Sequence, residues 1–350
     1  MSNVGETAAG RRRVRELLGS RPGTLPPGPL NAITDVDGVL VGHVTLIEGA
    51  DVRTGVTAVR PHPGNVFAGR VPAGLVTANG FGKLIGSTQV EELGELETPI
   101  VLTNTLAAAR AAAALSDWML ALPANAEVTS INPFVGETND GKLNDIRRPS
   151  ITSEHVERAL EEAAAGPVAE GAVGAGTGTV AFGYKGGIGT SSRVVSCAGQ
   201  RYTVGVLVQS NFGGDLNFAG LRLPEDDAQA EDDADGSIMI IVATDAPLSD
   251  RNLRRLAFRA HGGLARTGAG FSNGSGDYAV AFSTAAEVRR SAGAGFDAGG
   301  LGNTVVNPLF MAAVEATEEA VLNSLAQAEA MTGYRGLHVP ALPLARLGRF

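Results

Sequence analysis

The stretch that decides the fold is the run GSIMIIVATD, residues 236–245. Its middle is continuously apolar, which is typical of a strand that is buried on both faces. Directly before it, residues 225–235 read EDDAQAEDDAD and hold seven acidic residues and no basic one. Blocks of like charge are usually solvated loops. The sequence therefore predicts an accessible acidic loop that ends at Gly236, followed by a central strand that begins at Ser237.

Outside this stretch, strand and helix patterns alternate without a strict period. Short β-branched runs predict strands, among them residues 127–131. The alanine-rich residues 106–122 predict a buried helix, and Ser249 is well placed to cap another. A last helix is expected to begin at Asn307 and to run to Gly333. These elements predict a layered α/β or α+β sandwich.

Charge and composition exclude several classes of protein. The chain has 350 residues, and 28 basic against 37 acidic residues give a net charge of 28 − 37 = −9. This acidity argues against nonspecific binding to nucleic acid or to an anionic membrane surface. No uncharged apolar run approaches the roughly 20 residues of a membrane helix, and no secretory signal is visible. A cytoplasmic protein is expected.

The cysteine and histidine content argues against metal and disulfide chemistry. A single Cys197 excludes an intramolecular disulfide and a multi-cysteine metal site, and no two of the five histidines have metal-ligand spacing. We expect no metal and no cofactor. Residues 1–30 are polar and then rich in proline and glycine, so they are expected to form a flexible tail before a single domain, residues 31–350.

The junction at Gly236 and Ser237 suggests another kind of chemistry. Cleavage before Ser237 would create a chain end that carries both a hydroxyl and an α-amine. The pKa of an α-amine is roughly 7.7–8.0, so the amine could serve as the base for its own hydroxyl. The residues alone still favour the plainer interpretation, an ordinary serine where a loop becomes a strand. A serine nucleophile in a G-x-S-x-G turn has weaker support, because no such motif follows a predicted strand. A phosphate-binding loop at residues 183–190 also has weaker support, because it lacks Lys-Ser/Thr at the position that such loops require.

Ordered motifs around this junction resemble those of the DmpA-type aminopeptidases, a family of L-aminopeptidase/D-esterases and β-peptidyl aminopeptidases related in fold to ornithine acetyltransferase. The resemblance spans nearly the whole chain from about residue 31. The motifs that carry it are Ile33-Thr34-Asp35-Val36, Val41-Gly42-His43, Ala78-Asn79-Gly80, Thr103-Asn104-Thr105, Gly136-Glu137-Thr138, residues 185–193, Val208-Gln209 with Asn211, Gly236-Ser237, and Gly274-Ser275-Gly276-Asp277.

The resemblance implies a four-layer αββα sandwich that cuts itself between Gly236 and Ser237. The products would be residues 1–236 and the remaining 350 − 236 = 114 residues, 237–350. It implies that these parts stay together as an αβ heterodimer and assemble into a tetramer of heterodimers. The implied substrates are small peptides, amino-acid amides or esters with a free amine.

The resemblance also implies roles for individual residues. Ser237 would be the nucleophile, and Ser275 and Asp277 would position or activate its hydroxyl and amine. Asn211 would donate to the developing oxyanion, and Glu137 would pair with the substrate's amino group. The substrate-binding position two residues after that glutamate holds Asn139, where the family pattern has tyrosine.

Two other functions share this fold. An acyltransferase of the ornithine acetyltransferase type would pass the acyl group to an amine acceptor instead of water. An unprocessed chain would serve as a non-catalytic scaffold. Both alternatives stay open at the level of the sequence.

Overall fold

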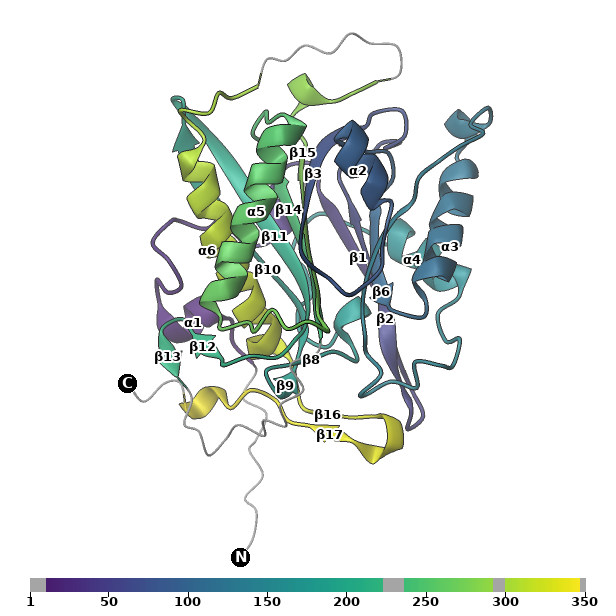
Figure 1. Cartoon of the computed structure of the whole chain (residues 1–350), viewed down its shortest axis with the longest axis vertical. Helices are drawn as coiled ribbons and strands as arrows, with labels where there is room; N and C mark the ends of the chain where they lie inside the picture. Colours follow the sequence, from purple (N-terminus) through teal and green to yellow (C-terminus); the bar gives the residue numbers. More distant parts are fainter. Residues whose placement is uncertain (1–10, 223–235, 292–299, 347–350) are drawn as a thin grey trace, which may run out of the picture.

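A computed structural model describes residues 11–222, 236–291 and 300–346, and arranges them as two β-sheets packed between two layers of helices (Figure 1). The first sheet has the order β1 (Leu40–Glu48), β2 (Val52–Arg60), β6 (Ile100–Asn104), β7 (Phe134–Thr138) and β4 (Leu84–Ile85). The second has the order β10 (Gly187–Cys197), β11 (Gln200–Asn211), β14 (Ser237–Thr244), β15 (Gly276–Ser283), β3 (Val71–Gly80) and β5 (Glu95–Leu96). This arrangement confirms the expected sandwich.

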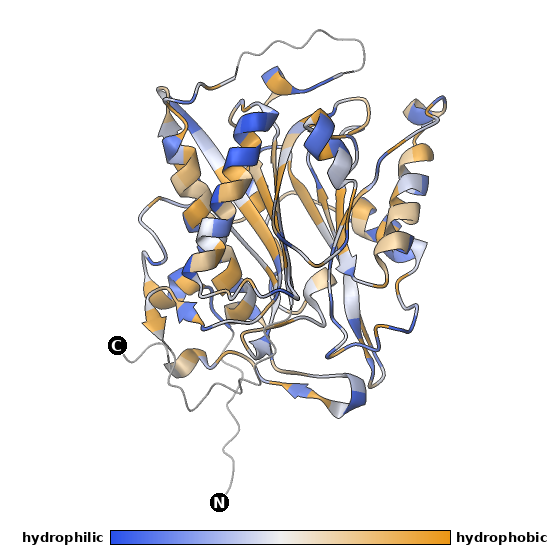
Figure 2. Ribbon diagram, viewed as in Figure 1, coloured by the Kyte–Doolittle hydropathy of each residue, from blue (hydrophilic) through white to orange (hydrophobic). Residues whose placement is uncertain are grey.

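The predicted central strand is β14, and it is buried along its whole length. Ile238, Ile240 and Val242 belong to the hydrophobic cluster between the second sheet and its helices. Met239 and Ile241 alternate with them and belong to the cluster between the two sheets. Both faces of β14 therefore require apolar side chains, and Figure 2 shows these inner strands as the most hydrophobic part of the molecule.

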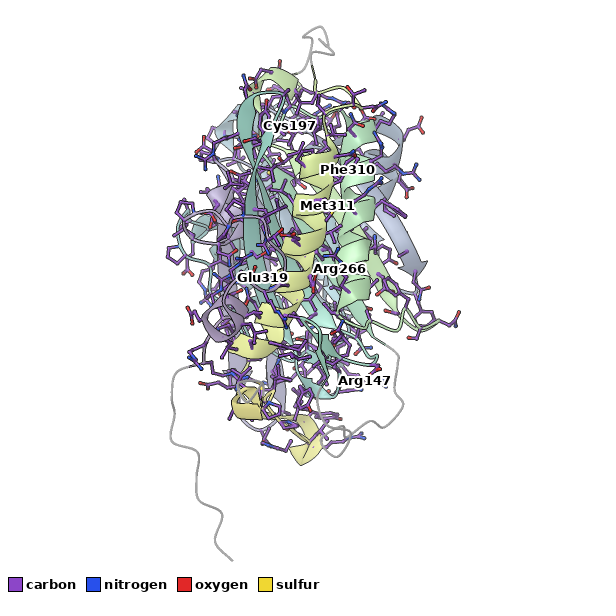
Figure 3. The ribbon with its side chains drawn as sticks, turned by 90° about the vertical axis from the view of Figure 1, so that its left-hand side faces the viewer. Arg147, Cys197, Arg266, Phe310, Met311 and Glu319 are labelled. Carbon is purple, nitrogen blue, oxygen red and sulfur yellow. The ribbon has the colours of Figure 1, made fainter. Side chains whose placement is uncertain are left out.

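Each sheet is covered on its outer face by two long helices. The second sheet is covered by α5 (Asp250–Arg266) and α6 (Asn307–Gln327), and the first by α3 (Ala108–Leu120) and α4 (Ser153–Glu161). Figure 3 shows Phe310, Met311 and Glu319 following the length of α6. The expected cap of α5 is confirmed, because the Ser249 side chain accepts a hydrogen bond from Asn252 N. No helix in the described ranges is both long and apolar enough to span a bilayer.

Two expected elements differ in the structure. Residues 127–131 form no strand, and the strand begins later, at Phe134. The reason is packing, since Phe134 and Val135 reach the cores on opposite faces of the sheet, whereas Ile131 is only partly buried. The last helix ends at Gln327 rather than at Gly333. The acidic run 225–235 lies outside the described residues.

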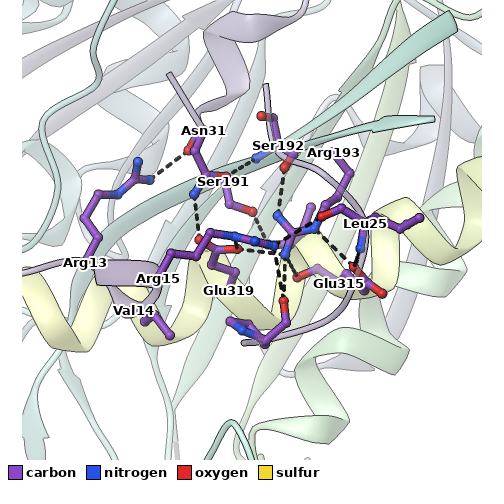
Figure 4. Close-up of polar contacts among 12 residues, drawn as sticks. Arg13, Val14, Arg15, Leu25, Asn31, Ser191, Ser192, Arg193, Glu315 and Glu319 are labelled. Atoms are coloured by element: carbon purple, nitrogen blue, oxygen red, sulfur yellow. Dashed lines mark hydrogen bonds and ion pairs between the residues drawn. The ribbon is translucent and has the colours of Figure 1, made fainter. Parts of the chain in front are cut away.

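The segment expected to be a flexible tail is packed against the second sheet's helices from Arg11 onward, while residues 1–10 lie outside the described residues. Arg13 donates to Thr190 O at 2.7 Å, and Arg15 forms an ion pair with Glu319 at 2.8 Å. The same Glu319 binds the fully buried Arg193 (Figure 4). The expectation of a tail is therefore wrong for residues 11–30, because their arginines meet buried acceptors that composition cannot reveal.

Candidate active site

Three neighbouring strands bring the candidate residues to one edge of the second sheet. Ser237 is the first residue of β14 and lies opposite Asn211, the last residue of the antiparallel β11. On its other side it is level with Gly276, the first residue of the parallel β15. Parallel strands begin at the same edge, and an antiparallel neighbour ends there. The strand order thus gathers residues that lie 26 and 39 positions from Ser237 in the chain.

One backbone N–H connects the predicted nucleophile with the predicted cleavage site. Gly276 N donates to the carbonyl oxygen of Gly236 at 3.1 Å and to Ser237 Oγ at 3.2 Å. The serine hydroxyl therefore lies beside the peptide bond that precedes its own residue, and that carbonyl already accepts a hydrogen bond. Ser237 is only 5% exposed, so water does not surround the pair.

Ser275 and Asp277 form a buried pair next to Gly276. Ser275 Oγ donates to Asp277 Oδ1 at 2.7 Å, and Asp277 Oδ2 is buried without a hydrogen-bond partner among the described residues. Burial raises the pKa of Asp277, and the bond from Ser275 opposes that shift. The free carboxylate oxygen can accept a further hydrogen bond or face a positive charge.

The side chain of Asn211 is held at both ends of its amide. Oδ1 accepts from Val180 N at 3.0 Å, and Nδ2 donates to Asn139 O at 3.0 Å. An amide nitrogen carries two N–H donors, and the second has no partner among the described residues. Asn211 can therefore offer one donor to a group at the Ser237 position.

Glu137 is a buried carboxylate at the end of β7, and it is 2% exposed. It accepts from Lys83 N at 2.8 Å and from the Thr105 hydroxyl. Within the ranges that the structure describes, no basic side chain forms an ion pair with it. Buried carboxylates are usually paired. Glu137 therefore has the burial and charge to receive a cationic group.

The loop after β3 lies between this carboxylate and the edge of the sheet where Ser237 begins β14. A methyl group on Gly82 would lie 3.2 Å from Glu137 Oε1, and one on Gly276 would lie 3.2 Å from Gly82 Cα. Phe81 N also donates to Ser275 O at 3.1 Å. The backbone of Gly82 and Gly276 therefore connects the surroundings of the Glu137 carboxylate with those of the Ser237 hydroxyl.

Asn139, the expected substrate-binding residue, lies next to Asn211 in the structure. Its side chain is exposed and accepts from Gly141 N at 2.9 Å, which closes a local turn. Its backbone carbonyl instead accepts the bond from Asn211 Nδ2. The structure thus connects Asn139 to the site through its main chain.

Sequence reasoning missed three contributors to the site. Gly276 acts through its backbone N–H, so no side-chain signal could have identified it. Thr105 ends one of the motifs given above, and its hydroxyl was the only signal in the sequence. Its contact with the buried carboxylate of Glu137 appears only in the structure. Gln209 joins the two sheets below the site, since Nε2 donates to Thr103 O, Thr138 Oγ1 and Ala175 O.

The described ranges contain no group of three or more histidine, cysteine, aspartate or glutamate side chains placed to share a metal ion.

Comparisons with known proteins agree with this geometry. A sequence model of peptidase family S58 matches residues 31–339. The β-peptidyl aminopeptidase BapA of Sphingosinicella microcystinivorans is 42% identical, over 98% of this chain and 93% of that protein. The crystal structure of the PH0078 protein from Pyrococcus horikoshii matches with a TM-score of 0.90 and 47% identity, over 97% of this chain and 99% of that one.

A further solved structure identifies the type of fold. The L-aminopeptidase D-Ala-esterase/amidase of Ochrobactrum anthropi, described as a prototype serine aminopeptidase and a variant of the Ntn hydrolase fold, matches with a TM-score of 0.88 and 39% identity. Each chain covers 96% of the other. The family resemblance inferred from the motifs is confirmed by these matches.

Proposed function

The chain belongs to peptidase family S58, and on that premise we propose that it is a self-processing serine aminopeptidase with Ser237 as its nucleophile. It cuts itself after Gly236 and then removes the N-terminal residue from small peptides, amides or esters that carry a free amine. The observation that carries this proposal is the Gly276 N–H, which hydrogen-bonds both the carbonyl of Gly236 and the hydroxyl of Ser237.

Self-cleavage begins with attack of Ser237 Oγ on the carbonyl carbon of Gly236. The C–N bond breaks, the hydroxyl proton passes to the departing nitrogen, and an ester joins the two parts. Water then hydrolyses the ester, which leaves a carboxylate on Gly236 and an amine on Ser237. The bond from Gly276 N supports this step, because a donor fixed on the carbonyl oxygen stabilises the negative charge that develops there.

The two parts stay joined after cleavage because the cut lies at the edge of a continuous sheet. β14 pairs with β11 on one side, and β15 pairs with β3 on the other. The strands of residues 237–350 are therefore hydrogen-bonded to strands of residues 1–236. Cleavage removes one covalent bond and leaves these ladders intact.

In each turnover the new α-amine serves as the base. With a pKa of roughly 7.7–8.0 it is partly neutral near pH 7.5 and can accept the proton of its own hydroxyl. The Ser275–Asp277 pair orients the amine, using the carboxylate oxygen that has no other partner in the described chain. The spare N–H of Asn211 donates to the tetrahedral oxyanion.

Glu137 explains why the substrate needs a free amine. Its buried carboxylate has no ion-pair partner among the described residues, so an ammonium group of the substrate would supply the missing charge. The acyl-enzyme that forms on Ser237 is then hydrolysed by water, and the free N-terminal residue leaves.

The test is intact mass spectrometry with N-terminal sequencing of the purified protein. We expect two fragments, the second starting Ser-Ile-Met-Ile, and we expect Ser237→Ala to remain a single 35.7 kDa chain without hydrolysis. Ser283→Ala is the matched control, because it removes a buried serine at the opposite end of β15. A mature, active protein with an internal Ser237, or cleavage by Ser237→Ala at the same bond, would contradict the proposal. Release of free amino acid without an amine acceptor separates hydrolysis from acyl transfer.

A further inference from the structure

Lys185 is a buried cation that the proposed mechanism does not use. It lies on β9 (Tyr184–Lys185) and is fully buried. Its Nζ donates to three backbone carbonyls, Gly176 O at 2.9 Å, Thr179 O at 2.8 Å and Gly186 O at 2.8 Å. Two of these acceptors lie in one loop, residues 176–179, the third belongs to the residue that follows Lys185, and none of the three is a side chain.

That loop ends at the peptide unit that holds Asn211. Thr179 O and Val180 N belong to the same peptide bond, and a peptide unit is planar and stiff. Its oxygen accepts from Lys185 Nζ, and its N–H donates to Asn211 Oδ1 at 3.0 Å. Lys185 and Asn211 therefore bind opposite sides of one rigid plane, and a shift of the plane moves the amide of Asn211.

The loop itself has little freedom to shift by other means. A methyl group on Gly176 would lie 2.4 Å from Ile188 N, and one on Gly178 would lie 2.0 Å from Arg53 O. The backbone is packed against its neighbours on these sides. On the side facing Lys185, Thr179 O also accepts from Gly186 N at 3.0 Å and Gly176 O from the Thr179 hydroxyl at 3.0 Å, and the ammonium group supplies the only charged donor that the structure gives these two carbonyls among the described residues.

Asp140, which follows β7 of the first sheet, is the second buried charged residue near Asn211. It follows Asn139, whose carbonyl accepts from Asn211 Nδ2, and its Cβ would lie 3.0 Å from a methyl group on Gly178. Burial lowers the pKa of Lys185 to about 7, and the charge of Asp140 opposes this shift. Both Lys185 and Asp140 thus contact the loop that fixes the amide.

We infer that Lys185 is a positioning residue that, through the Thr179–Val180 peptide, aims the free N–H of Asn211 at the reacting carbonyl. This inference rests on the proposed function, because it takes Asn211 as the oxyanion donor. A lysine with a purely structural role would stabilise the loop but would leave the turnover of the folded enzyme unchanged.

The test is a double-mutant cycle with Lys185→Met and Asn211→Ala, measured on the full chain with an amino-acyl p-nitroanilide. A misplaced catalytic group can cost about 100-fold in rate, and loss of one oxyanion donor costs about 100- to 1,000-fold in kcat. We expect Lys185→Met to lower kcat by about 10- to 100-fold, with KM changed less than about twofold. In the Asn211→Ala background the same change should cost less than about threefold.

Two further variants keep the outcome clear. Lys185→Gln retains two N–H donors and should recover part of the lost kcat, and it replaces Lys185→Met in the cycle if that variant does not fold. Ser283→Ala loses a buried hydrogen bond far from the site and should lower the melting temperature without changing kcat. Where a variant matures slowly, the first-order rate of self-cleavage is compared in the same cycle.

The two possible failures are distinguishable. If Asn211→Ala keeps the wild-type kcat, the proposed oxyanion donor is wrong. If Asn211→Ala is impaired but Lys185→Met is not, or if their losses multiply, the positioning role of Lys185 is overturned while the proposed function stands.

Discussion

Replacing Gly236 with alanine should block self-cleavage by displacing the bond that is cut. A methyl group at this position would lie 2.2 Å from Asn211 O and 2.6 Å from Phe212 Cα. Both neighbours are backbone atoms of the adjacent strand, so they cannot rotate away. Non-bonded heavy atoms prefer separations of about 3.5 Å. Residue 236 would therefore have to move by roughly 1 Å.

A displacement of that size has a large effect on a reaction that depends on alignment. Misplacement by about 1 Å can cost about 100-fold in rate, which corresponds to about 2.7 kcal/mol in the activation barrier. The bond from Gly276 N to Gly236 O would lengthen at the same time. We expect the first-order rate of self-cleavage of Gly236→Ala to fall by about 100-fold, while any matured fraction keeps a normal kcat.

The measurement is a time course of fragment formation after purification, followed by denaturing gel and intact mass. Gly302→Ala is the matched control, because no atom lies within 4 Å of a methyl group there. It should cleave at the wild-type rate, and it should gain up to about 1 kcal/mol of stability from the stiffer unfolded chain. Cleavage of Gly236→Ala at the wild-type rate would refute the argument that this carbonyl is held in place for attack.

Three further predictions test other parts of the site and the fold. Glu137→Gln removes the charge but keeps the shape of the side chain, so KM for a substrate with a free amine should rise by about 10- to 100-fold. Equal KM values for the variant and the wild type would show that Glu137 does not bind the substrate. Asp277→Asn removes a negative charge beside the α-amine of Ser237, which lowers the pKa of that amine, so the acidic limb of the pH–kcat/KM profile should move to lower pH. An unchanged limb would show that Asp277 does not influence the pKa of the amine. Burial lowers the pKa of His43 to about 4, whereas its ordinary value is about 6.5. The unfolded chain therefore binds more protons between these values, and stability falls as the pH drops through them. His43→Leu should reduce the loss of unfolding free energy between pH 7 and pH 5 by about 2 kcal/mol, measured by urea unfolding; an identical loss in both proteins would show that His43 does not titrate in this window.

Local patterns in the sequence were sufficient where one element determines its own structure. The apolar run after Gly236 predicted β14, because a strand buried on both faces leaves no polar position. Ser249 predicted the start of α5, because a serine cap acts on the next turn of its own chain. The error at residues 127–131 shows the limit of this reasoning. Their β-branched side chains favour a strand, but pairing and burial select Phe134–Thr138 instead.

The contacts that make the site depend on the order of the strands, which local patterns do not contain. The roles of Ser275 and Asp277 came from a resemblance, and only the register of β14 with β15 places them beside Ser237. Arg13 and Arg15 were interpreted as parts of a tail, since the acceptors that tie them to the sheet and to α6, Thr190 and Glu319, lie more than 150 positions away in the chain. The contact between the Asn139 carbonyl and Asn211 Nδ2 is made by the main chain, so no side-chain pattern could have predicted it.

The strand order also supports the part of the proposed mechanism that uses no histidine base. β14 and β15 run parallel, while β11 and β3 run antiparallel to them, so two strand starts and two strand ends meet at one edge. His261, the histidine nearest this edge, has Nε2 at 3.4 Å from the backbone carbonyl of Asp277, and burial lowers its pKa. It therefore contacts the main chain of the site and not the Ser237 hydroxyl. In the proposed mechanism the base is the amine that cleavage would create, because the nitrogen of Ser237 is carried on the same residue as the hydroxyl it must deprotonate.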